Sequence, residues 1–368
     1  MLFRSMLPAA IPSYLRTGAS VTNDSLLSLL GAVLLYELCR VIAGDLSRKT
    51  AIRAGIWWGL MLLTKGIALI LPPVIVVAYL VGASGALRNR IRTAVLPCLT
   101  AGITGFVLGG WWYIRNLVDF GAVQPRGKGP DWPPTRLYGF NDSGTTTGLI
   151  TTYIKRFAMR FFGSLGLIDR PGWPRTALWA LFAVLLVLLV LGVVAGVNRA
   201  SAPRWGAIAL ILPATLCFLS IPVKVRHTYL ITNTIPGIQI RYLNAFLSGL
   251  AIVAAVALVL VLRRVGRWLT ALVYTLIALF QIANVVLLLD QQFGSSTGTI
   301  VHRIDRGVVF LLRCSPYPDW LSVVIVLVTA AIAIWTLVAL LRHAGDHADP
   351  DSSGEPAAGH RLAEAVEV

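Results

Sequence analysis

The chain has 368 residues, of which 57% are hydrophobic and only 13% are charged, and its mean hydropathy is +0.76. A water-soluble domain cannot bury so much apolar surface, so the composition excludes that class and makes lipid the solvent of many residues. The net charge of +16 does not indicate nucleic acid as a partner, because the basic residues lie in short segments between apolar runs and form no stripe with interleaved aromatic residues.

Residues 1–24 are expected to form an N-terminal segment outside the membrane. Arg4 is basic, as at the start of a signal peptide, but Pro8, Pro12 and Arg16 interrupt any apolar core, so the segment does not resemble one. A basic chain that begins outside without a signal is difficult to insert. We therefore expect that upstream spans are missing from this sequence, and the alternative is a first span that inserts as a reverse signal anchor.

The apolar runs predict an all-α fold, a polytopic transmembrane bundle of about nine spans. Four spans lie in residues 25–114 and five in residues 176–341. The second and third spans are separated only by Thr64-Lys65-Gly66, which predicts a tight hairpin, and Pro72-Pro73 are expected to kink the third near its start. The spans are expected at 25–43, 52–64, 67–83, 95–114, 176–197, 206–221, 243–262, 269–290 and 320–341.

The basic residues of the short connections predict the orientation. They follow the first, third, fifth, seventh and ninth spans, which end on one side if the spans alternate, and such a side is cytoplasmic. The sequence therefore predicts a multi-pass protein of the plasma (inner) membrane, with its N-terminus outside and residues 342–368 as a disordered cytoplasmic tail. These basic residues are Arg48, Lys49, Arg53, Arg88, Arg90, Arg92, Arg199, Arg204, Arg263, Arg264, Arg267 and Arg342.

A long external loop, residues 115–175, is expected between the fourth and fifth spans. Its first half is rich in glycine and proline, which predicts irregular structure. From Thr147 to Leu165, apolar residues recur at helical spacing with Lys155, Arg156 and Arg160 between them. This pattern predicts an amphipathic helix on the outer membrane surface. A helix packed against the protein's own loops is an equally good interpretation, and both can hold.

Two charged residues border apolar runs on the predicted outer side. Asp24, preceded by Asn23, could cap the first span, take a proton from an acceptor hydroxyl, or hold a divalent cation, the one cofactor the sequence raises. Lys65 is the lone cation between two apolar runs. It could reach the lipid headgroups or hold a lipid phosphate. We expect the two residues to open onto one shared site.

An aromatic run closes the fourth span. Trp111, Trp112 and Tyr113 are typical of a membrane-interface belt, which Arg115 could anchor. The same residues suit a sugar, because aromatic faces stack on pyranose rings while Arg115 and Asn116 can bond hydroxyl groups. Both interpretations stay open at this stage.

The predicted external loop 222–242 carries several cations, against the orientation rule, and this favours anion binding. Arg241 directly precedes a span and should lie at the rim of a site, whereas a lone His227 does not indicate a metal. The polar residues of this loop are Lys224, Arg226, His227, Arg241 and Tyr242.

Other candidate chemistry is sparse. The sequence contains no Gly-x-Ser-x-Gly, Walker, His-Glu-x-x-His or dinucleotide-binding motif. The four cysteines lie mostly in apolar runs and are expected to be small buried residues rather than disulfide partners or metal ligands. Glu37, inside the first span, is expected to form an ion pair with Arg40 on the same helix face.

Several motifs resemble those of GT-C membrane glycosyltransferases, the group that contains protein mannosyltransferases and lipid A aminoarabinose transferases. Residues 59–72, which read Gly-Leu-Met-Leu-Leu-Thr-Lys-Gly and then Ala-Leu-Ile-Leu-Pro, resemble their "GLxLLTKG–xALxLP" segment. Residues 21–24 are similar to their second acidic segment, and residues 112–116 to their Trp-Tyr segment. Two further motifs, Phe162 to Gly166 and Arg241-Tyr242, resemble related bacterial membrane proteins, and the ordered set spans residues 8–260.

The resemblance implies a GT-C-like fold that transfers a sugar from a polyprenyl-phosphate donor in the lipid bilayer to an acceptor on the external face. It implies a catalytic role for Asp24 and donor-phosphate contacts from Lys65 and Arg241. The principal catalytic acid of the family lies in a region that this sequence lacks, so an N-terminally truncated enzyme is expected. The alternatives are a transporter or flippase for a lipid-linked sugar or other anion, or a non-catalytic membrane protein. The expected substrate-binding residues are Asn23, Trp112, Tyr113, Arg115, Asn116 and Tyr242.

Overall fold

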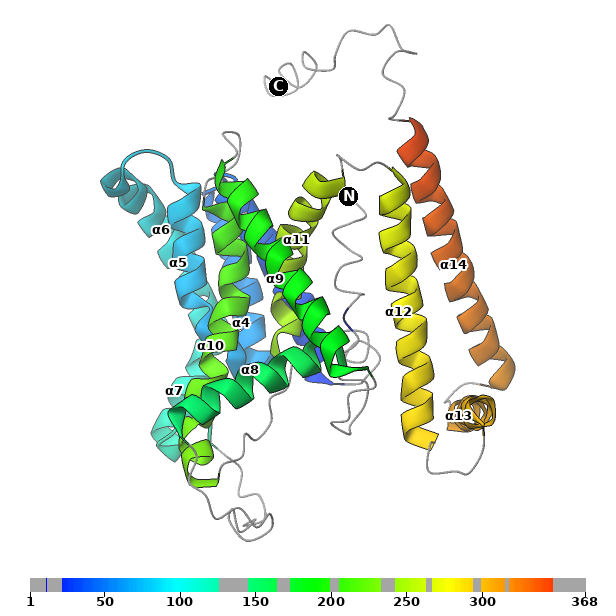
Figure 1. Cartoon of the computed structure of the whole chain (residues 1–368). Coiled ribbons are helices and arrows are strands. Elements are labelled where there is room, and N and C mark those ends of the chain that lie inside the picture. Colours follow the sequence, from blue (N-terminus) through cyan, green and yellow to red (C-terminus); the bar gives the residue numbers. More distant parts are fainter. Residues whose placement is uncertain are drawn as a thin grey trace, which may run out of the picture.

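The computed structural model is a bundle of helices, which confirms the predicted all-α fold (Figure 1). It describes residue 11 and residues 22–125, 145–163, 173–198, 205–232, 242–262, 267–293, 299–314 and 318–346, and these residues contain no strand. Within them, four segments are long and apolar enough to cross a membrane, namely Asn23–Ile42, Leu87–Phe120, Arg175–Asn198 and Gly206–His227. The bundle is therefore that of a polytopic membrane protein.

Each of the nine predicted spans coincides with helix. In the first half, the helices are α3 (Asn23–Ile42), α4 (Arg48–Thr64), the 3₁₀ turn η1 (Gly66–Ile70), α5 (Pro72–Gly82), α6 (Leu87–Gly105), the π-helical turn η2 (Phe106–Gly110) and α7 (Trp111–Phe120). In the second half, they are α9 (Arg175–Asn198), α10 (Gly206–Thr232), η4 (Asn244–Phe246), α11 (Leu247–Leu262), α12 (Arg267–Phe293) and α14 (Asp319–Asp346). The apolar periodicity thus located the elements well.

The chain turn after α4 differs from the prediction. Pro72 and Pro73 do not kink a helix but begin α5, where a proline fits because the first N–H groups of a helix have no partner within the helix. Lys65 stands alone in extended backbone (φ −162°, ψ 137°) between α4 and η1. The expected hairpin is therefore a short 3₁₀ turn flanked by two separate helices.

Close helix packing fixes the end of α4 that carries Lys65. Gly109 lies so close to the carbonyl of Gly59 that a β-carbon there would overlap it, so only glycine lets η2 approach α4 to this distance. The Trp58 indole N–H donates to the carbonyl of Ala68 (3.0 Å), which ties η1 back to α4. The surrounding core is apolar and includes the buried residues Leu27, Leu30, Leu34, Met61, Leu62 and Val74.

The predicted amphipathic segment is helical, as α8 (Thr146–Gly163), and lies across the lower end of the bundle in Figure 1. Its apolar face packs on the protein. The Tyr153 hydroxyl donates to the carbonyl of Phe218 (2.8 Å), and the Phe157 ring contacts those of Phe218 (4.7 Å between centroids) and Phe182 (6.0 Å). α8 thus packs against α9 and α10 rather than against loops, and its place on a membrane surface stays a prediction.

Two expected loops contain helix instead. In the expected loop 222–242, α10 continues to Thr232 and leaves Lys224, Arg226 and His227 exposed on it. In the connection between the predicted spans 269–290 and 320–341, α13 (Ile300–Cys314) lies at the lower end of the bundle beside α12 and α14 (Figure 1). Hydropathy missed both segments because charged residues interrupt their apolar positions, although charged residues are good helix formers.

The predicted N-terminal segment and cytoplasmic tail lie mostly outside the described residues. Of residues 1–21, only Ile11 is described, and it is buried. α14 continues to Asp346, a little beyond the predicted end of the last span. The tail after Asp346 lies outside the described residues.

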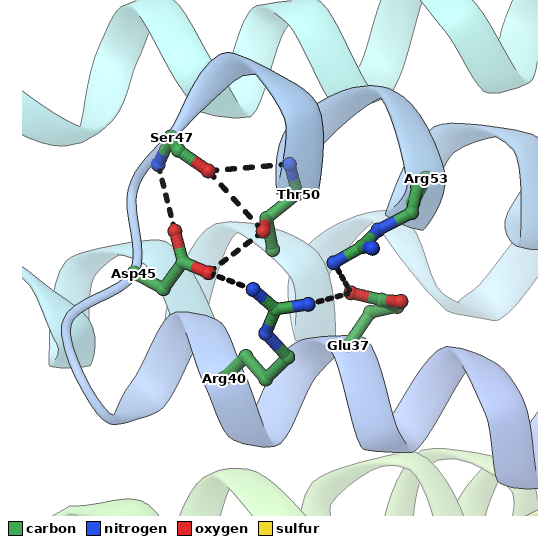
Figure 2. A network of polar contacts seen from close by, with 6 residues as sticks. All are labelled: Glu37, Arg40, Asp45, Ser47, Thr50 and Arg53. Atoms are coloured by element: carbon green, nitrogen blue, oxygen red, sulfur yellow. Dashed lines mark hydrogen bonds and ion pairs between the residues drawn. The ribbon is translucent and has the colours of Figure 1, made fainter.

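An ion-pair cluster joins α3 to α4 at the ends of these helices away from Lys65 (Figure 2). Glu37, which is buried, pairs with Arg40 (3.7 Å) as predicted, and also with Arg53 of α4 (3.2 Å). The second partner could not be foreseen from helix spacing. A buried carboxylate is stable only with such partners, so this cluster favours one register between the two helices.

Asp45, in the turn between α3 and α4, extends this cluster (Figure 2). It accepts hydrogen bonds from the Ser47 backbone N–H (3.2 Å), the Thr50 hydroxyl (2.8 Å) and Arg40 (2.6 Å). Hydrogen bonds from Ser47 and Thr50, followed by that from Arg40, lower the pKa of Asp45 to about 2. The turn is therefore held by a carboxylate that stays ionised.

Candidate functional site

The structure brings Asp24 and Lys65 into direct contact. Asp24 lies in the first turn of α3, Lys65 lies directly after α4, and the Lys65 ammonium donates to a carboxylate oxygen of Asp24. The Asp24 side chain is 2% exposed and that of Lys65 is 20% exposed. The two residues that border different apolar runs therefore form one largely buried ion pair whose cation alone reaches the surface.

The start of α3 explains the position of Asp24. The helix begins at Asn23, so Thr22 occupies the capping position that the sequence suggested for Asp24, which lies instead in the first turn. A carboxylate there is favoured by the positive end of the helix dipole. The Asn23 side-chain amide donates to the carbonyl of Thr64 (3.4 Å) and so joins the start of α3 to the end of α4. This bond keeps Asp24 beside Lys65.

Tyr242 supplies a third side chain to this cluster. The Lys65 ammonium lies 4.6 Å from the centre of the Tyr242 ring, a cation–π geometry that stabilises a partly buried cation. The Cys217 thiol of α10 contacts the carbonyl of Tyr242 (3.6 Å) and helps to hold this residue just before η4. Residues from three distant parts of the sequence thus meet around one ammonium group. The predicted phosphate ligand Arg241 lies outside the described residues.

Two of the predicted substrate-binding residues on α7 face the protein. The Tyr113 hydroxyl donates to the carbonyl of Leu62 (2.6 Å), and the Asn116 amide donates to the carbonyl of Val123 (3.4 Å). Both side chains are buried. Tyr113 therefore fastens α7 to the end of α4, and Asn116 holds the chain that follows α7. In this structure both side chains donate hydrogen bonds to backbone carbonyl groups.

Trp112 and Arg115 lie on the exposed side of α7. The Arg115 guanidinium lies 5.5 Å from the centre of the Trp112 ring and pairs with Asp119 (3.2 Å). Within the described part of the chain, neither residue contacts the Asp24–Lys65 pair. Of the two interpretations of the aromatic run, this arrangement favours a membrane-interface belt over a sugar-binding surface.

Gln124 was not foreseen from the sequence, because a lone glutamine in a polar connection carries no pattern. Its side-chain amide lies against Gly66, in the position that a β-carbon of residue 66 would fill. Gly66 directly follows Lys65, so the amide lies beside the cluster.

A small apolar cavity lies between α3, α4 and η4, and its lining begins at Gly31, two helical turns along α3 from Asp24. In the described residues, no group of three or more His, Cys, Asp or Glu side chains is placed to hold a metal ion, and the divalent cation raised by the sequence stays a prediction. The cavity is lined by Gly31, Leu34, Leu35, Met61, Leu71 and Phe246, among others.

Residues 2–112 match the family model of the dolichyl-phosphate-mannose-protein mannosyltransferases. The match covers under a third of the chain and includes Asp24 and Lys65. It confirms the resemblance to GT-C-type membrane glycosyltransferases and supports a membrane glycosyltransferase in general. No curated protein and no solved structure shows significant similarity to the chain.

Proposed function

We propose that the chain transfers a sugar from a polyprenyl-phosphate donor to an acceptor on the extracytoplasmic face of the membrane, at a site formed by Asp24, Lys65 and Tyr242. The observation that carries this proposal is the Asp24–Lys65 ion pair within the segment that matches the family model. Such a transfer requires a base for the acceptor hydroxyl and a cation for the donor phosphate, on opposite sides of the sugar, so a bound donor must separate the two side chains.

Lys65 is suited to hold the donor phosphate. Its ammonium is the more exposed member of the pair, so an anion can reach it from the surface while Asp24 stays buried. The Tyr242 ring covers another side of the cation and limits its hydration. A phosphate at this position would take over the charge compensation that Asp24 provides in the present structure.

Release of Asp24 from Lys65 would then leave a carboxylate able to accept a proton. In the proposed step, the acceptor hydroxyl oxygen bonds to the anomeric carbon while the bond from that carbon to the phosphate oxygen breaks. The hydroxyl proton passes to Asp24, and the electron pair of the broken bond stays on the polyprenyl phosphate, whose charge Lys65 compensates. Single displacement inverts the anomeric carbon, as the family resemblance implies.

The apolar surroundings suit a lipid-linked donor. The cavity beginning at Gly31 is lined by apolar side chains from α3, α4 and α10 and by Leu71, Ala245 and Phe246, and it lies along α3 from the ion pair. This cavity is too small for a lipid chain, but the exposed side chains of Leu26 and Leu29 on the same helix offer an apolar surface to the first part of the donor's chain. The distribution of basic residues over the short connections supports an outward location of the site.

A transfer assay with the full chain in liposomes tests the proposal. The donor is polyprenyl-phosphate mannose with a radiolabelled sugar, chosen from the printed name of the matching family, and the acceptors are those of a membrane extract. We expect label to leave the lipid in the wild type, and Asp24→Asn to lower the rate by about 100-fold or more. Lys65→Met should raise the donor KM and lower kcat together.

Arg92→Gln is the matched control for loss of a positive charge, since Arg92 is exposed on α6 and takes no part in the cluster. It should transfer at the wild-type rate. A transfer rate in Asp24→Asn equal to that of the wild type would refute the assignment of Asp24 as the base. If the donor crosses the liposome membrane and no sugar is transferred, the protein is a transporter and not an enzyme.

A further inference from the structure

Gly66 and Gln124 are coupled by direct contact. A β-carbon on residue 66 would overlap the Gln124 side-chain amide where it now lies, so alanine there would displace the end of this flexible, exposed side chain. The backbone does not explain the glycine, because the positive-φ glycines of the described chain are Gly44, Gly85 and Gly121. The glycine that follows Lys65 therefore contacts a side chain that lies far away in the sequence.

The segment that carries Gln124 is held in place from α7. Gly121, in the left-handed region (φ 65°), ends α7 and lets the chain turn back. The buried Asn116 amide then donates to the carbonyl of Val123, the residue before Gln124. Asn116 is thus a positioning residue, and it fixes the backbone from which the Gln124 amide reaches Gly66.

We propose that the side-chain amide of Gln124 is a specificity-determining contact for the sugar of the donor, and that Gly66 leaves room for the amide in this position; this inference rests on the proposed function. Gln124 is exposed, and its amide lies against the residue that follows Lys65. Among the described residues it has no hydrogen-bond partner. It is therefore available to a ligand whose phosphate lies on Lys65.

The chemistry of an amide suits a sugar rather than a second phosphate. It offers two donors and an acceptor in one plane, which can pair with neighbouring hydroxyl groups, whereas Lys65 can only donate. A site that bonds a hydroxyl discriminates strongly against an analogue that lacks it, because its polar groups then stay unpaired. Lys65 would thus anchor any lipid phosphate, and Gln124 would select among the sugars.

A double-mutant cycle on donor kinetics tests the proposal, with Gln124→Ala, Gly66→Ala and the combined variant. We expect Gln124→Ala to raise the donor KM by about 10-fold and to change kcat by less than about 2-fold, because the contact acts mainly on binding. Gly66→Ala should raise the donor KM similarly, since it displaces the amide. The combined variant should be no worse than either single variant, because both remove the same contact.

A donor that lacks one sugar hydroxyl provides a second measurement. In the wild type, kcat/KM should be about 10-fold lower for the deoxy donor that cannot make the Gln124 contact than for the complete donor. In Gln124→Ala, the two donors should have equal kcat/KM values. A merely structural role of Gln124 would lower transfer of both donors equally. Gly102→Ala is the matched control, because a β-carbon on Gly102 meets nothing within 4 Å, and its KM should equal that of the wild type.

The possible failures are distinct. If the wild type transfers the sugar and Gln124→Ala has the same donor KM, this inference is wrong and the proposed function stands. The same holds if the KM effects of Gln124→Ala and Gly66→Ala multiply in the combined variant. A wild type that neither transfers the sugar nor shows a thermal shift with the donor would overturn both.

Discussion

Removing the ammonium of Lys65 while Asp24 remains should destabilise the protein more than removing both charges. Lys65→Met keeps an apolar stem of similar length but takes the ammonium away from the carboxylate of Asp24, which is 2% exposed. Breaking a fully buried ion pair in this way costs about 3–5 kcal/mol. Because Lys65 keeps 20% exposure and water can reach the vacated position, we expect about 2–3 kcal/mol.

Loss of the contact with the Tyr242 ring adds a smaller term, on the order of 0.5–1 kcal/mol. The combined variant Asp24→Asn/Lys65→Met removes the buried carboxylate charge as well as the ammonium. It should therefore recover at least about 1 kcal/mol relative to Lys65→Met alone. The contribution of the ion pair to stability is given by the coupling free energy between the two substitutions, not by the change in unfolding free energy of either single variant.

The assay is reversible unfolding of the full chain in detergent micelles, followed by tryptophan fluorescence. Arg115→Met is the matched control, because it breaks an exposed ion pair with side chains 58% and 44% exposed and should cost no more than about 0.5 kcal/mol. Equal effects of Lys65→Met and Arg115→Met, or strictly additive effects of Asp24→Asn and Lys65→Met, would refute the reasoning.

Three further predictions concern separate features. Tyr242→Leu removes the aromatic face over Lys65 and should raise the donor KM by about 2- to 10-fold, whereas Tyr242→Phe, which keeps the ring, should not; equal KM values would argue against the cation–π contact. Because folding lowers the pKa of Asp45 to about 2, its stabilisation is complete above the unfolded pKa of about 4 and is lost as the pH falls toward 2. The unfolding free energy should therefore fall less over this window in Asp45→Asn, as measured by denaturant titration from pH 5 to pH 2.5. Trp173→Phe removes the indole N–H that donates to the buried Asn284 (2.7 Å) and should cost about 1–2 kcal/mol, while Trp179→Phe, on an exposed face, should cost little in the same unfolding assay.

The sequence alone determined the class of fold and the place of most elements. Apolar runs of sufficient length can be satisfied in lipid only as helices, so the helices of the bundle could be located from hydropathy and length. The amphipathic period of residues 147–165 likewise predicted α8. Where charged residues interrupt the apolar pattern, in the continuation of α10 and in α13, hydropathy failed although the backbone is helical.

The site depended on contacts between distant residues, which only the tertiary structure decided. The sequence predicted one shared site for Asp24 and Lys65, but only the packing of α3 on α4 made them a direct ion pair, and the approach of η4 added Tyr242. No local pattern could connect Gly66 with Gln124, because their contact depends on the turn that follows α7. Hydrophobic periodicity specifies which face of a helix is buried, whereas the partner of a polar side chain is set by the register in which whole helices pack.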